Sequence, residues 1–478
     1  MRKRWLKFAA VPISLALVAA SCSTEDDGDD ADSGSSTPAG TEAPGDTATD
    51  DTATDSSEPA TEGTEPLPST PGAGSAGSVT VFGVEDSENE AGAMQDALAE
   101  FGAANGIDIT YVGRRDFEQQ INVQVLAGNP PDIAAFPQPG KLVQFANDGD
   151  VLPLPEDVLS SVQENWDESY LSFTNVDEVQ YGVPFKSDLK SLVWYVPSVW
   201  EEKGYEVPET LTEFNEVVDE MIANGDTPLC VGIGSDAATG WPFTDWVEEL
   251  ILRQEGIEYY NDWVANEVPF DDQPVIDTFN EISGPDGLWN KEGAVYSSGG
   301  SIAATAFGDN AEPLVNGDCM MHRQASFFSA FFPEGTQFGT GDGQVSTFYF
   351  PSDEGTPVLV GGISAGAFRD APEVWQVMEY LGSAEFANAR QAAQSERVGG
   401  GLSGFLTGNT NADTSQWDEL EQGFIELLQT ADPAAFDGSD QMPAEVGSGA
   451  FWTEGTSFVN GDVDAETATG NIQSAWPN

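Results

Sequence analysis

The sequence is poor in basic residues and contains a single histidine. Its 478 residues include 16 lysines and arginines against 82 aspartates and glutamates, which gives a formal net charge of −66. Nucleic acids and anionic lipid headgroups bind proteins through basic surfaces, so the charge balance argues against both as partners. The one histidine, His322, leaves little room for a histidine-rich metal site. We therefore expect no metal ion and no cofactor.

Long hydrophobic runs are also scarce. The one clear run covers residues 8–20, which is 13 residues, whereas a membrane-spanning helix needs about 20. Basic residues at positions 2, 3, 4 and 7 precede this run, as in a secretory signal. Small residues then lead into Cys22 and resemble the bacterial lipobox, with Ala19 where such motifs often carry leucine. We predict a lipoprotein signal peptide over residues 1–22 with Cys22 lipidated; ordinary cleavage beside an incidental cysteine is the alternative.

Residues 23–78 lack basic residues altogether and contain 14 acidic ones. The segment consists mainly of Thr, Ala, Asp, Glu, Gly, Ser and Pro, so it offers little apolar surface to offset the entropy of ordering. Like charges make such a chain extend. We predict a disordered acidic tether that holds the folded part away from a membrane surface.

Cysteines are few. With Cys22 assigned to the signal, Cys230 and Cys319 remain. One leftover pair in a secreted chain favours a disulfide, although two buried free thiols would also fit.

The folded part, from about residue 79 onward, exceeds the 250–300 residues that one hydrophobic core usually fills, so we expect at least two lobes. Apolar β-branched runs at residues 78–83, 107–112 and 133–136 alternate with helical patterns at residues 90–104 and 117–127. This order predicts a parallel sheet flanked by helices. Further strands near residues 228–233, 319–322 and 347–350 predict a second α/β lobe. Helical patterns between and after them include residues 210–223, 241–254, 274–282 and 372–381.

Motifs of catalysis fail on their context. The run from Gly362 to Gly366 fits the nucleophile elbow of α/β hydrolases, but that triad needs a histidine after the serine, and His322 comes before it. A looser dinucleotide-binding pattern begins at Gly232, yet Thr239, Gly240 and Pro242 interrupt the position where its helix should run. We expect no catalytic residues.

Aromatic and polar residues gather instead at the predicted strand ends. The segments are residues 136–140, 184–190, 239–246, 322–327 and 451–454. In open α/β sheets ligands bind beyond the carboxyl ends of the strands. Aromatic faces beside carboxylate, amide and guanidinium groups suit a neutral polyhydroxylated ligand, whose C–H face stacks on a ring while its hydroxyls hydrogen-bond.

These same segments carry a resemblance to a known family. The matching stretches are residues 127–133 with 136–140, Gly240-Trp241-Pro242 with residues 244–246, Cys319 with residues 322–327, and the closing residues 475–477. Together they resemble the maltose-binding type (family 1) of extracellular solute-binding proteins of ABC importers. Within that type they are most similar to the α-glucoside-binding proteins. The resemblance implies a type II periplasmic-binding-protein fold. In that fold two α/β lobes, each a mostly parallel sheet flanked by helices, are joined by several crossovers and hold sugar between them.

By the same resemblance, residues 79–195 plus 351–394 form the first lobe and residues 196–350 plus 395–478 the second. The implied ligand-binding residues are Glu85, Gln138, Asp188, Trp241, Asp245, Arg323 and Trp452. Trp241 is the expected stacking platform, and Asp245 and Arg323 are the expected partners of ligand hydroxyls.

The resemblance thus implies a monomeric receptor rather than an enzyme. It is expected outside the cell membrane, anchored through Cys22, where it delivers a sugar such as maltose, trehalose or sucrose to an ABC permease. Two alternatives stay open. One is a receptor for a cationic solute, which the acidity would favour; the other is an extracellular glycoside hydrolase.

Overall fold

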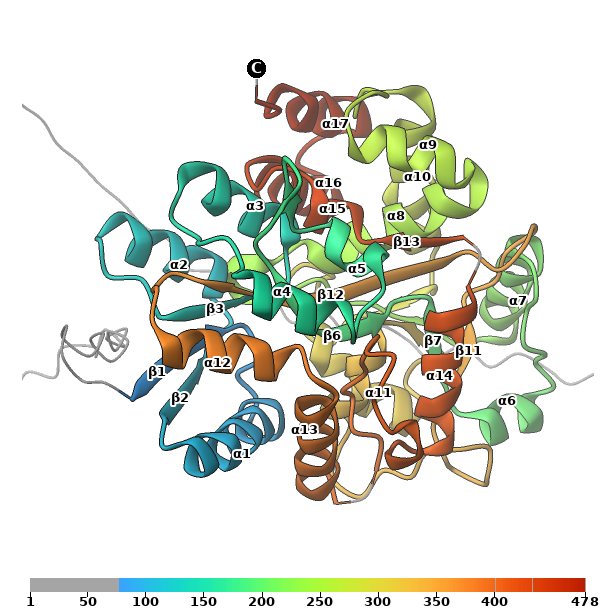
Figure 1. Ribbon diagram of the computed structural model, residues 1–478. Helices are drawn as coiled ribbons and strands as arrows, with labels where there is room; N and C mark the ends of the chain where they lie inside the picture. Colours follow the sequence, from blue (N-terminus) through green and yellow to red (C-terminus); the bar gives the residue numbers. More distant parts are fainter. Residues whose placement is uncertain (1–76, 400, 432, 478) are drawn as a thin grey trace, which may run out of the picture. The chain divides into compact units, whose positions relative to one another are not determined.

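The structure, a computed structural model, describes residues 77–399, 401–431 and 433–477. The expected signal peptide, Cys22 and all of the expected tether before residue 77 lie outside these residues. The described chain is an α/β structure built on two large sheets (Figure 1). Among its helices, none combines the length and apolar character that crossing a membrane requires.

The first sheet has six strands in the order β13-β12-β3-β1-β2, with β6 also paired to β12. The strands are β1 (Ser78–Gly83), β2 (Asp108–Gly113), β3 (Ile133–Phe136), β6 (Val183–Leu189), β12 (Val358–Ala367) and β13 (Ala434–Phe436). β1 pairs in parallel with β2 and β3, as the sequence predicts. β12 is antiparallel to both β3 and β6, so the sheet is mixed.

The second sheet has five strands in the order β11-β7-β10-β8-β9. They are β7 (Leu192–Tyr195), β8 (Leu229–Cys230), β9 (Val295–Tyr296), β10 (Met321–Arg323) and β11 (Ser346–Tyr349); a separate hairpin joins β4 (Asn175–Val176) and β5 (Val179–Gln180). β8 is parallel to β9 and β10, whereas β7 is antiparallel to β10 and β11.

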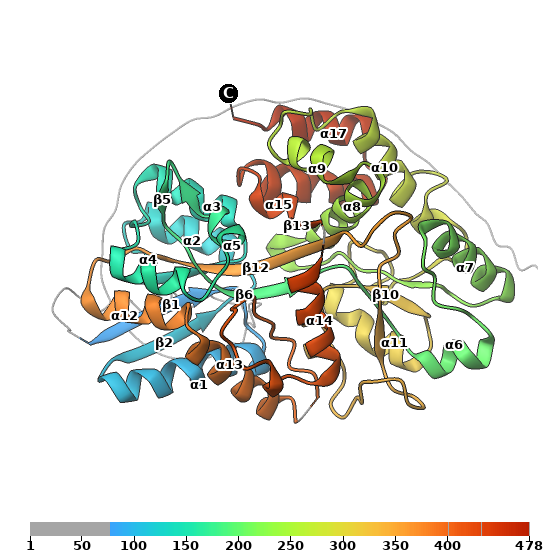
Figure 2. The same ribbon diagram turned by 45° about the vertical axis from the view of Figure 1, so that its right-hand side comes forward.

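The chain crosses between the two sheets at two places in the described residues, between β6 and β7 and between β11 and β12. After β13 it leaves the first sheet again for helices that pack in the second lobe. Figure 2 shows β6 and β12, which pair with each other, crossing the middle of the view together. The expected division placed residues 192–195 in the first lobe and 434–436 in the second. β7 instead pairs in the second sheet and β13 in the first. Strands this short carry no pattern that reveals which sheet they will join.

Helices cover both sheets. The α-helices of the first half are α1 (Glu88–Asn105), α2 (Phe117–Leu126), α3 (Pro139–Asp148), α4 (Glu156–Gln163), α5 (Glu168–Ser172), α6 (Pro197–Lys203), α7 (Leu211–Asn224), α8 (Trp241–Gln254), α9 (Gly256–Val264) and α10 (Gln273–Ser283). Those of the second half are α11 (Ala311–Asn316), α12 (Pro372–Leu381), α13 (Ala384–Arg397), α14 (Glu419–Thr430), α15 (Gly438–Gln441), α16 (Trp452–Val459) and α17 (Ala465–Ser474). α1, α12 and α13 pack with the first sheet, and α8, α10, α16 and α17 pack together in the second lobe (Figure 1).

Helix α8 is the buried centre of the second lobe. Every residue from Pro242 to Arg253 is buried, although the helix contains Asp245, Glu248 and Glu249. Charges are seldom fully buried unless they are paired. The burial of α8 therefore requires partners for these three carboxylates, and the site supplies several of them.

The two remaining cysteines are joined. Cys230 ends β8, Cys319 precedes β10, and their disulfide links segments whose Cα atoms are 5.4 Å apart. His322 lies beside this link, is 4% exposed, and shares a hydrogen bond of 2.8 Å between Nδ1 and the Cys230 carbonyl oxygen. Burial lowers the pKa of His322 to about 4, so the single histidine is a neutral core residue.

Candidate functional site

A cavity of about 120 Å³ lies between residues of the two lobes. Loops after β1 and β3 contribute Glu85 and Gln138, and these loops share one edge because β1 and β3 are parallel. β6 adds Lys186 and Asp188. The second lobe closes the cavity with residues in or next to five short or beginning helical segments: Ser235, Ala238, Trp241, Phe307, Ser439, Asp440 and Trp452.

Five of the seven residues expected to bind ligand line this cavity. They are Glu85, Gln138, Asp188, Trp241 and Trp452. Asp245 and Arg323 do not line it: both are buried one layer behind, Asp245 at 0% and Arg323 at 3% exposure. Asp245 reaches the cavity only through Lys190, which contacts both.

One wall of the cavity is aromatic. The ring of Trp241 lies 4.9 Å from the ring of Phe307 and 6.0 Å from that of Phe327, centroid to centroid. Each of the three rings also has a protein cation over it: Arg115 at 5.8 Å from Phe307, Lys186 at 5.5 Å from Phe327 and Lys190 at 5.6 Å from Trp241. The rings of the wall thus contact one another, and each already has a cation–π partner.

Gly240 brings the two tryptophans of the site together. It precedes α8 with φ of +115°, a conformation that favours glycine. A Cβ at this position would lie 2.3 Å from the carbonyl oxygen of Trp452. Only glycine lets α8 approach α16 this closely, so Trp241 and Trp452 can both face the cavity.

Four residues that line the cavity each carry a buried side-chain atom with no hydrogen-bond partner among the described residues. The atoms are Glu118 Oε2, Gln138 Oε1, Trp452 Nε1 and Asp188 Oδ1, the last of which lies 3.5 Å from Lys186 Nζ in an ion pair. Gln138 and Glu118 are themselves joined, since Gln138 Nε2 donates to Glu118 Oε1 at 3.2 Å. Buried polar groups are nearly always paired in native proteins. Two acceptors and one donor therefore remain for a bound molecule.

The first lobe contributes a group of paired charges. Glu85 Oε1 lies 3.0 Å from Lys186 Nζ and 3.1 Å from Arg390 Nη2, and Lys186 Nζ is 3.5 Å from Asp188 Oδ1. Burial alone would raise the pKa of Glu85, but Arg390 and Lys186 outweigh it and hold that pKa below its usual value. Glu85 is therefore ionised and its charge is compensated.

A second group of charges centres on Lys190, in the crossover between β6 and β7. Its Nζ lies 2.9 Å from Asp245 Oδ1 and also contacts Asp437, at the crossover after β13. Asp245 in turn receives Arg323 Nη1 at 3.0 Å. Burial opposes ionisation of Asp437, but the charge of Lys190 prevails and lowers its pKa. Lys190 thus connects two crossovers to helix α8.

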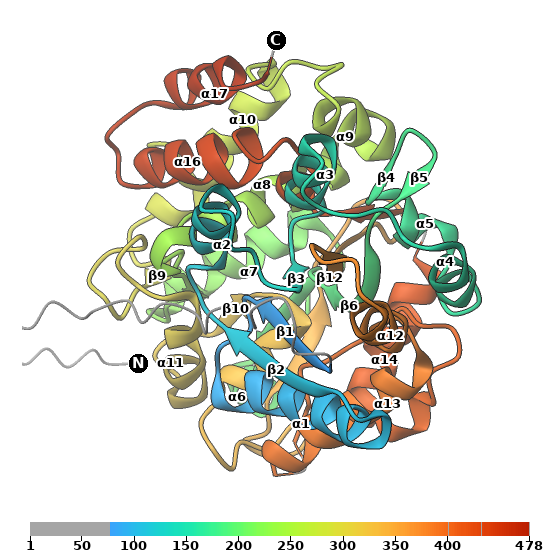
Figure 3. The ribbon, with the colours of Figure 1, turned by 60° about the vertical axis from the view of Figure 1, so that its left-hand side comes forward.

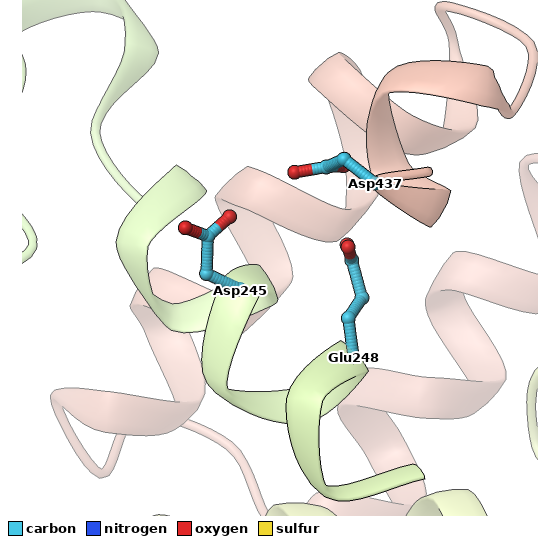
Figure 4. Close-up of side chains that lie close together, drawn as sticks. All are labelled: Asp245, Glu248 and Asp437. Atoms are coloured by element: carbon cyan, nitrogen blue, oxygen red, sulfur yellow. The ribbon is translucent and has the colours of Figure 1, made fainter. Parts of the chain in front are cut away.

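Asp245, Glu248 and Asp437 converge on a common point, which is an arrangement that could hold a metal ion (Figure 4). Their oxygens are already engaged, however. Lys190 bonds Asp245 and Asp437, and the backbone N–H groups of Gly438 and Ser439 donate to Glu248 at 2.9 and 3.0 Å. The ammonium of Lys190 thus already supplies a positive charge to two of the three carboxylates.

Two further acids of the cavity, Glu118 and Asp440, have raised pKa values. Burial raises the pKa of Glu118 to about 7, and burial followed by the nearby charge of Asp437 raises the pKa of Asp440 well above its usual value. Arg115 pairs with Asp86 at 2.9 Å. With Lys186 and Lys190 also paired, the cavity carries little net charge near neutral pH.

Sequence reasoning missed several cavity residues, namely Glu118, Arg115, Lys186, Lys190, Asp437 and Asp440. The two lysines lie in the segment 184–190 that was singled out at a strand end, so their position was visible but not their role. Asp437 and Asp440 follow the short apolar run of β13, which gave a weak signal of the same kind. Glu118 had none, because an acidic residue in the first turn of a helix is common.

Comparisons with known proteins place this chain in a family. The model for bacterial extracellular solute-binding proteins matches residues 85–387. The α-glucosides-binding periplasmic protein AglE of Rhizobium meliloti is 36% identical over 417 residues, covering 83% of this chain and 86% of the relative. The osmoprotective compounds-binding protein GgtB of Synechocystis is 35% identical over 409 residues, covering 84% and 92%.

Solved structures show the same fold. The bacterial solute receptor AcbH, described as having an exclusive preference for β-D-galactopyranose, superposes with a TM-score of 0.70 at 19% identity and covers 83% of this chain and 98% of its own. Maltose-bound MalE3 of T. maritima superposes with a TM-score of 0.65 at 17% identity, covering 84% and 98%.

Proposed function

This chain belongs to the bacterial extracellular solute-binding proteins of the maltose-binding type, and from that premise we propose that it captures a neutral α-glucoside in the cavity between its lobes. Membership makes it a receptor and not an enzyme, working outside the cytoplasm with an ABC permease as partner. Beyond family membership, we propose the identity of the solute and the means of anchoring.

The observation that carries the proposal is the pairing of an aromatic wall with unpartnered polar atoms. Trp241 offers a ring to the C–H face of a sugar. Glu118 Oε2 and Gln138 Oε1 offer acceptors and Trp452 Nε1 a donor to its hydroxyls. A neutral polyhydroxylated molecule can stack on the aromatic wall and hydrogen-bond to these polar atoms at the same time.

The charges favour a neutral solute over a cationic one. The three rings of the wall already have Arg115, Lys186 and Lys190 over them, so a cationic ligand would find a cation–π partner in place at each ring. The acids that could attract a cation are paired with these residues or, like Glu118 and Asp440, have raised pKa values. The overall acidity of the chain therefore does not describe its cavity.

The names of two relatives suggest which sugars to test first. One relative is named for α-glucosides and the other for osmoprotective compounds. Trehalose and sucrose belong to both classes, which makes them our first candidates, with maltose next.

Calorimetric titration with trehalose, sucrose and maltose, and with putrescine as the cationic comparison, tests the proposal. We expect at least one of the sugars to bind and to raise the melting temperature, since a ligand at 100 times its Kd stabilises by about 2.7 kcal/mol. Stabilisation by putrescine with no response to any of the sugars would overturn it.

The proposal includes anchoring through lipidated Cys22 and a monomeric state. The basic residues before the apolar run 8–20, and the small residues that lead into Cys22, support a lipid anchor. An acidic segment of the composition of residues 23–78 would then separate the folded lobes from the bilayer.

A further inference from the structure

Arg115 lies at the boundary between the two lobes and is held in place by the first of them. It comes two residues after the end of β2 and two before the start of α2. Its Nε lies 2.9 Å from Asp86 Oδ1, in the loop after β1, and its Nη2 lies 3.8 Å from Glu90 Oε2, in the first turn of α1. Two carboxylates of the first lobe therefore hold the Arg115 guanidinium.

Gly113, the last residue of β2, permits this arrangement. A Cβ at this position would lie 1.8 Å from the carbonyl oxygen of Glu85, so only glycine allows so close an approach. The loop after β1 therefore passes over the end of β2 and brings Asp86 to Arg115. Because both loops belong to the first sheet, we expect Arg115 to stay anchored when the lobes separate.

The Arg115 guanidinium also faces two aromatic rings of the second lobe. Its Cζ lies 5.8 Å from the centroid of the Phe307 ring and 5.7 Å from that of the Phe331 ring. Phe307 begins the short helix η3 (Phe307–Asn310), and Phe331 ends η4 (Ser326–Phe331). Both rings are within the roughly 6 Å at which a cation is attracted to an aromatic face.

The two rings are held together by the second lobe alone. Their centroids are 4.9 Å apart, and their planes are inclined at 65°. A Cβ at Gly308 would lie 2.5 Å from Cδ1 of Phe331, so this glycine leaves room for the ring. Phe307 is 5% exposed and its ring lies 4.9 Å from that of Trp241. Each side of the contact is therefore built within its own lobe, and only the contact itself depends on how close the lobes are.

The contact stands between the ligand cavity and a more open hollow of about 540 Å³. Arg115 and Phe307 line both spaces, so the two adjoin at these residues. Phe331 lines the hollow but not the cavity. Separating Arg115 from the two rings would therefore join the cavity to the hollow and open a path for the solute.

We propose that Arg115, through its contact with Phe307 and Phe331, sets how tightly the receptor retains its solute, because the contact stabilises the form in which the lobes are closed. Binding proteins of this fold close around their ligands by a hinge motion. A contact made only in the closed form shifts the population toward that form. It therefore raises the affinity for every solute by the same factor and slows release. The proposal rests on the solute-binding function, but it does not depend on which sugar is bound.

The alternative role for Arg115 is direct binding of the solute, because this residue also lines the cavity. Phe331 separates the two roles. It contacts Arg115 from the other lobe without lining the cavity, so it affects affinity only if the interlobe contact does. Arg115 is a positioning residue if the effects of the two side chains depend on each other.

A double-mutant cycle measures this dependence. Arg115→Met, Phe331→Leu and the double variant are titrated with trehalose, sucrose and maltose, and release is followed by stopped-flow tryptophan fluorescence. We expect Arg115→Met to weaken binding of each sugar that binds by the same factor, about 3- to 30-fold, through faster release. Phe331→Leu should weaken binding when Arg115 is present and have little further effect in Arg115→Met, because its partner is then gone.

Arg114→Met is the matched control. Arg114 precedes Arg115 directly, pairs with Asp116 at 2.7 Å, and lines neither the cavity nor the hollow. Its replacement should leave affinity and release unchanged, and melting temperatures show that each variant is folded. Arg115→Lys keeps the cation and should bind with intermediate affinity. Equal effects of Phe331→Leu in both backgrounds, or different factors for different sugars in Arg115→Met, would overturn the interlobe role.

The unliganded protein provides a test that needs no sugar. Spin labels are attached to ketone-bearing residues that replace Leu126 in the first lobe and Val207 in the second, which are 88% and 41% exposed. Pulsed electron resonance then measures the distance between the labels. We expect Arg115→Met to lose at least about half of the closed population, and Arg114→Met to keep it. Identical distance distributions with and without Arg115 would overturn the proposal. If the distances shift but none of the sugars binds, only the proposed solute is wrong.

Discussion

Lys190 Nζ lies 2.9 Å from Asp245 Oδ1, and this pair places the strongest sequence candidate for hydroxyl binding behind the cavity wall. Asp245 also accepts a hydrogen bond from Arg323 at 3.0 Å. Asp245 and Arg323 thus bind each other and their neighbours, and Lys190 is the member of the group that reaches the cavity. Asp245 and Arg323 therefore support the cavity wall from behind rather than lining it.

Lys190→Met should destabilise the protein strongly. It leaves Asp245 and Asp437 buried without their shared cation, and breaking a buried pair in this way costs about 3–5 kcal/mol. The loss should be smaller near pH 5 than near pH 8, because the stranded carboxylates can then take up protons. Urea unfolding at both pH values measures it.

Lys203→Met is the control for that experiment. Lys203 pairs with Asp226 at 2.7 Å, but its side chain is 36% exposed, so its removal should cost less than about 1 kcal/mol. Equal losses for the two variants would mean that the Lys190 group is not a buried network.

Trp241→Ala should weaken sugar binding more than it weakens the fold. Trp241 is only partly buried and lines the cavity, so we expect affinity to fall by about 10- to 100-fold, or roughly 1.4–2.8 kcal/mol. Phe243, two residues on in the same helix, is 0% exposed. Phe243→Ala should instead cost about 3–5 kcal/mol of stability. Titration and melting of both unliganded variants separate the roles; an unchanged affinity of Trp241→Ala would remove Trp241 from the site.

Glu118 should make stability fall as pH rises. Burial raises its pKa from 4.5 to about 7, so between these values the folded state keeps a proton that the unfolded chain has lost. Stability then decreases with increasing pH through this window and levels off above it, with a total effect of at most about 3 kcal/mol. Glu118→Gln should remove this part of the slope in urea unfolding at a series of pH values. The same slope in both proteins would contradict the assignment.

The disulfide should contribute on the order of 4 kcal/mol, because Cys230 and Cys319 are 89 residues apart and the bridge restricts the unfolded chain. We expect the double variant with alanine at both positions to melt well below the wild type, and reductant to lower only the wild-type melting temperature. A melting temperature equal to that of the wild type would mean that the bridge adds nothing.

Cys22→Ala should release the protein from the membrane. If the cysteine carries the lipid, the variant appears in the medium, while the wild type stays in the membrane fraction. Immunoblots of the two fractions decide this, and equal retention of both proteins would exclude a lipid anchor at Cys22.

The sequence predicted the local elements well where patterns were long. Helix α8 was expected over residues 241–254 and α12 over residues 372–381, and both occupy those residues. β1 and β3 also occupy their expected residues. Apolar spacing and the prolines in the first turns define these elements locally, so no distant contact was needed to place them. Figure 3 shows β1 and β2, the parallel pair that begins this pattern, side by side.

The tertiary structure alone decided which charged residue meets which. Gly240 and Trp452 lie more than two hundred residues apart, and only their contact puts both tryptophans at one cavity. The sequence determined the two-lobed α/β fold, the family and the strand ends that border the cavity, because these follow from local periodicity and short motifs. The sequence could not distinguish the roles of Asp245 and Glu118, because both are acidic residues and the sequence does not show which partners each one contacts after folding. Burial beside Lys190 makes Asp245 a paired structural group, whereas Glu118 keeps an unpartnered oxygen, Oε2, and lines the cavity.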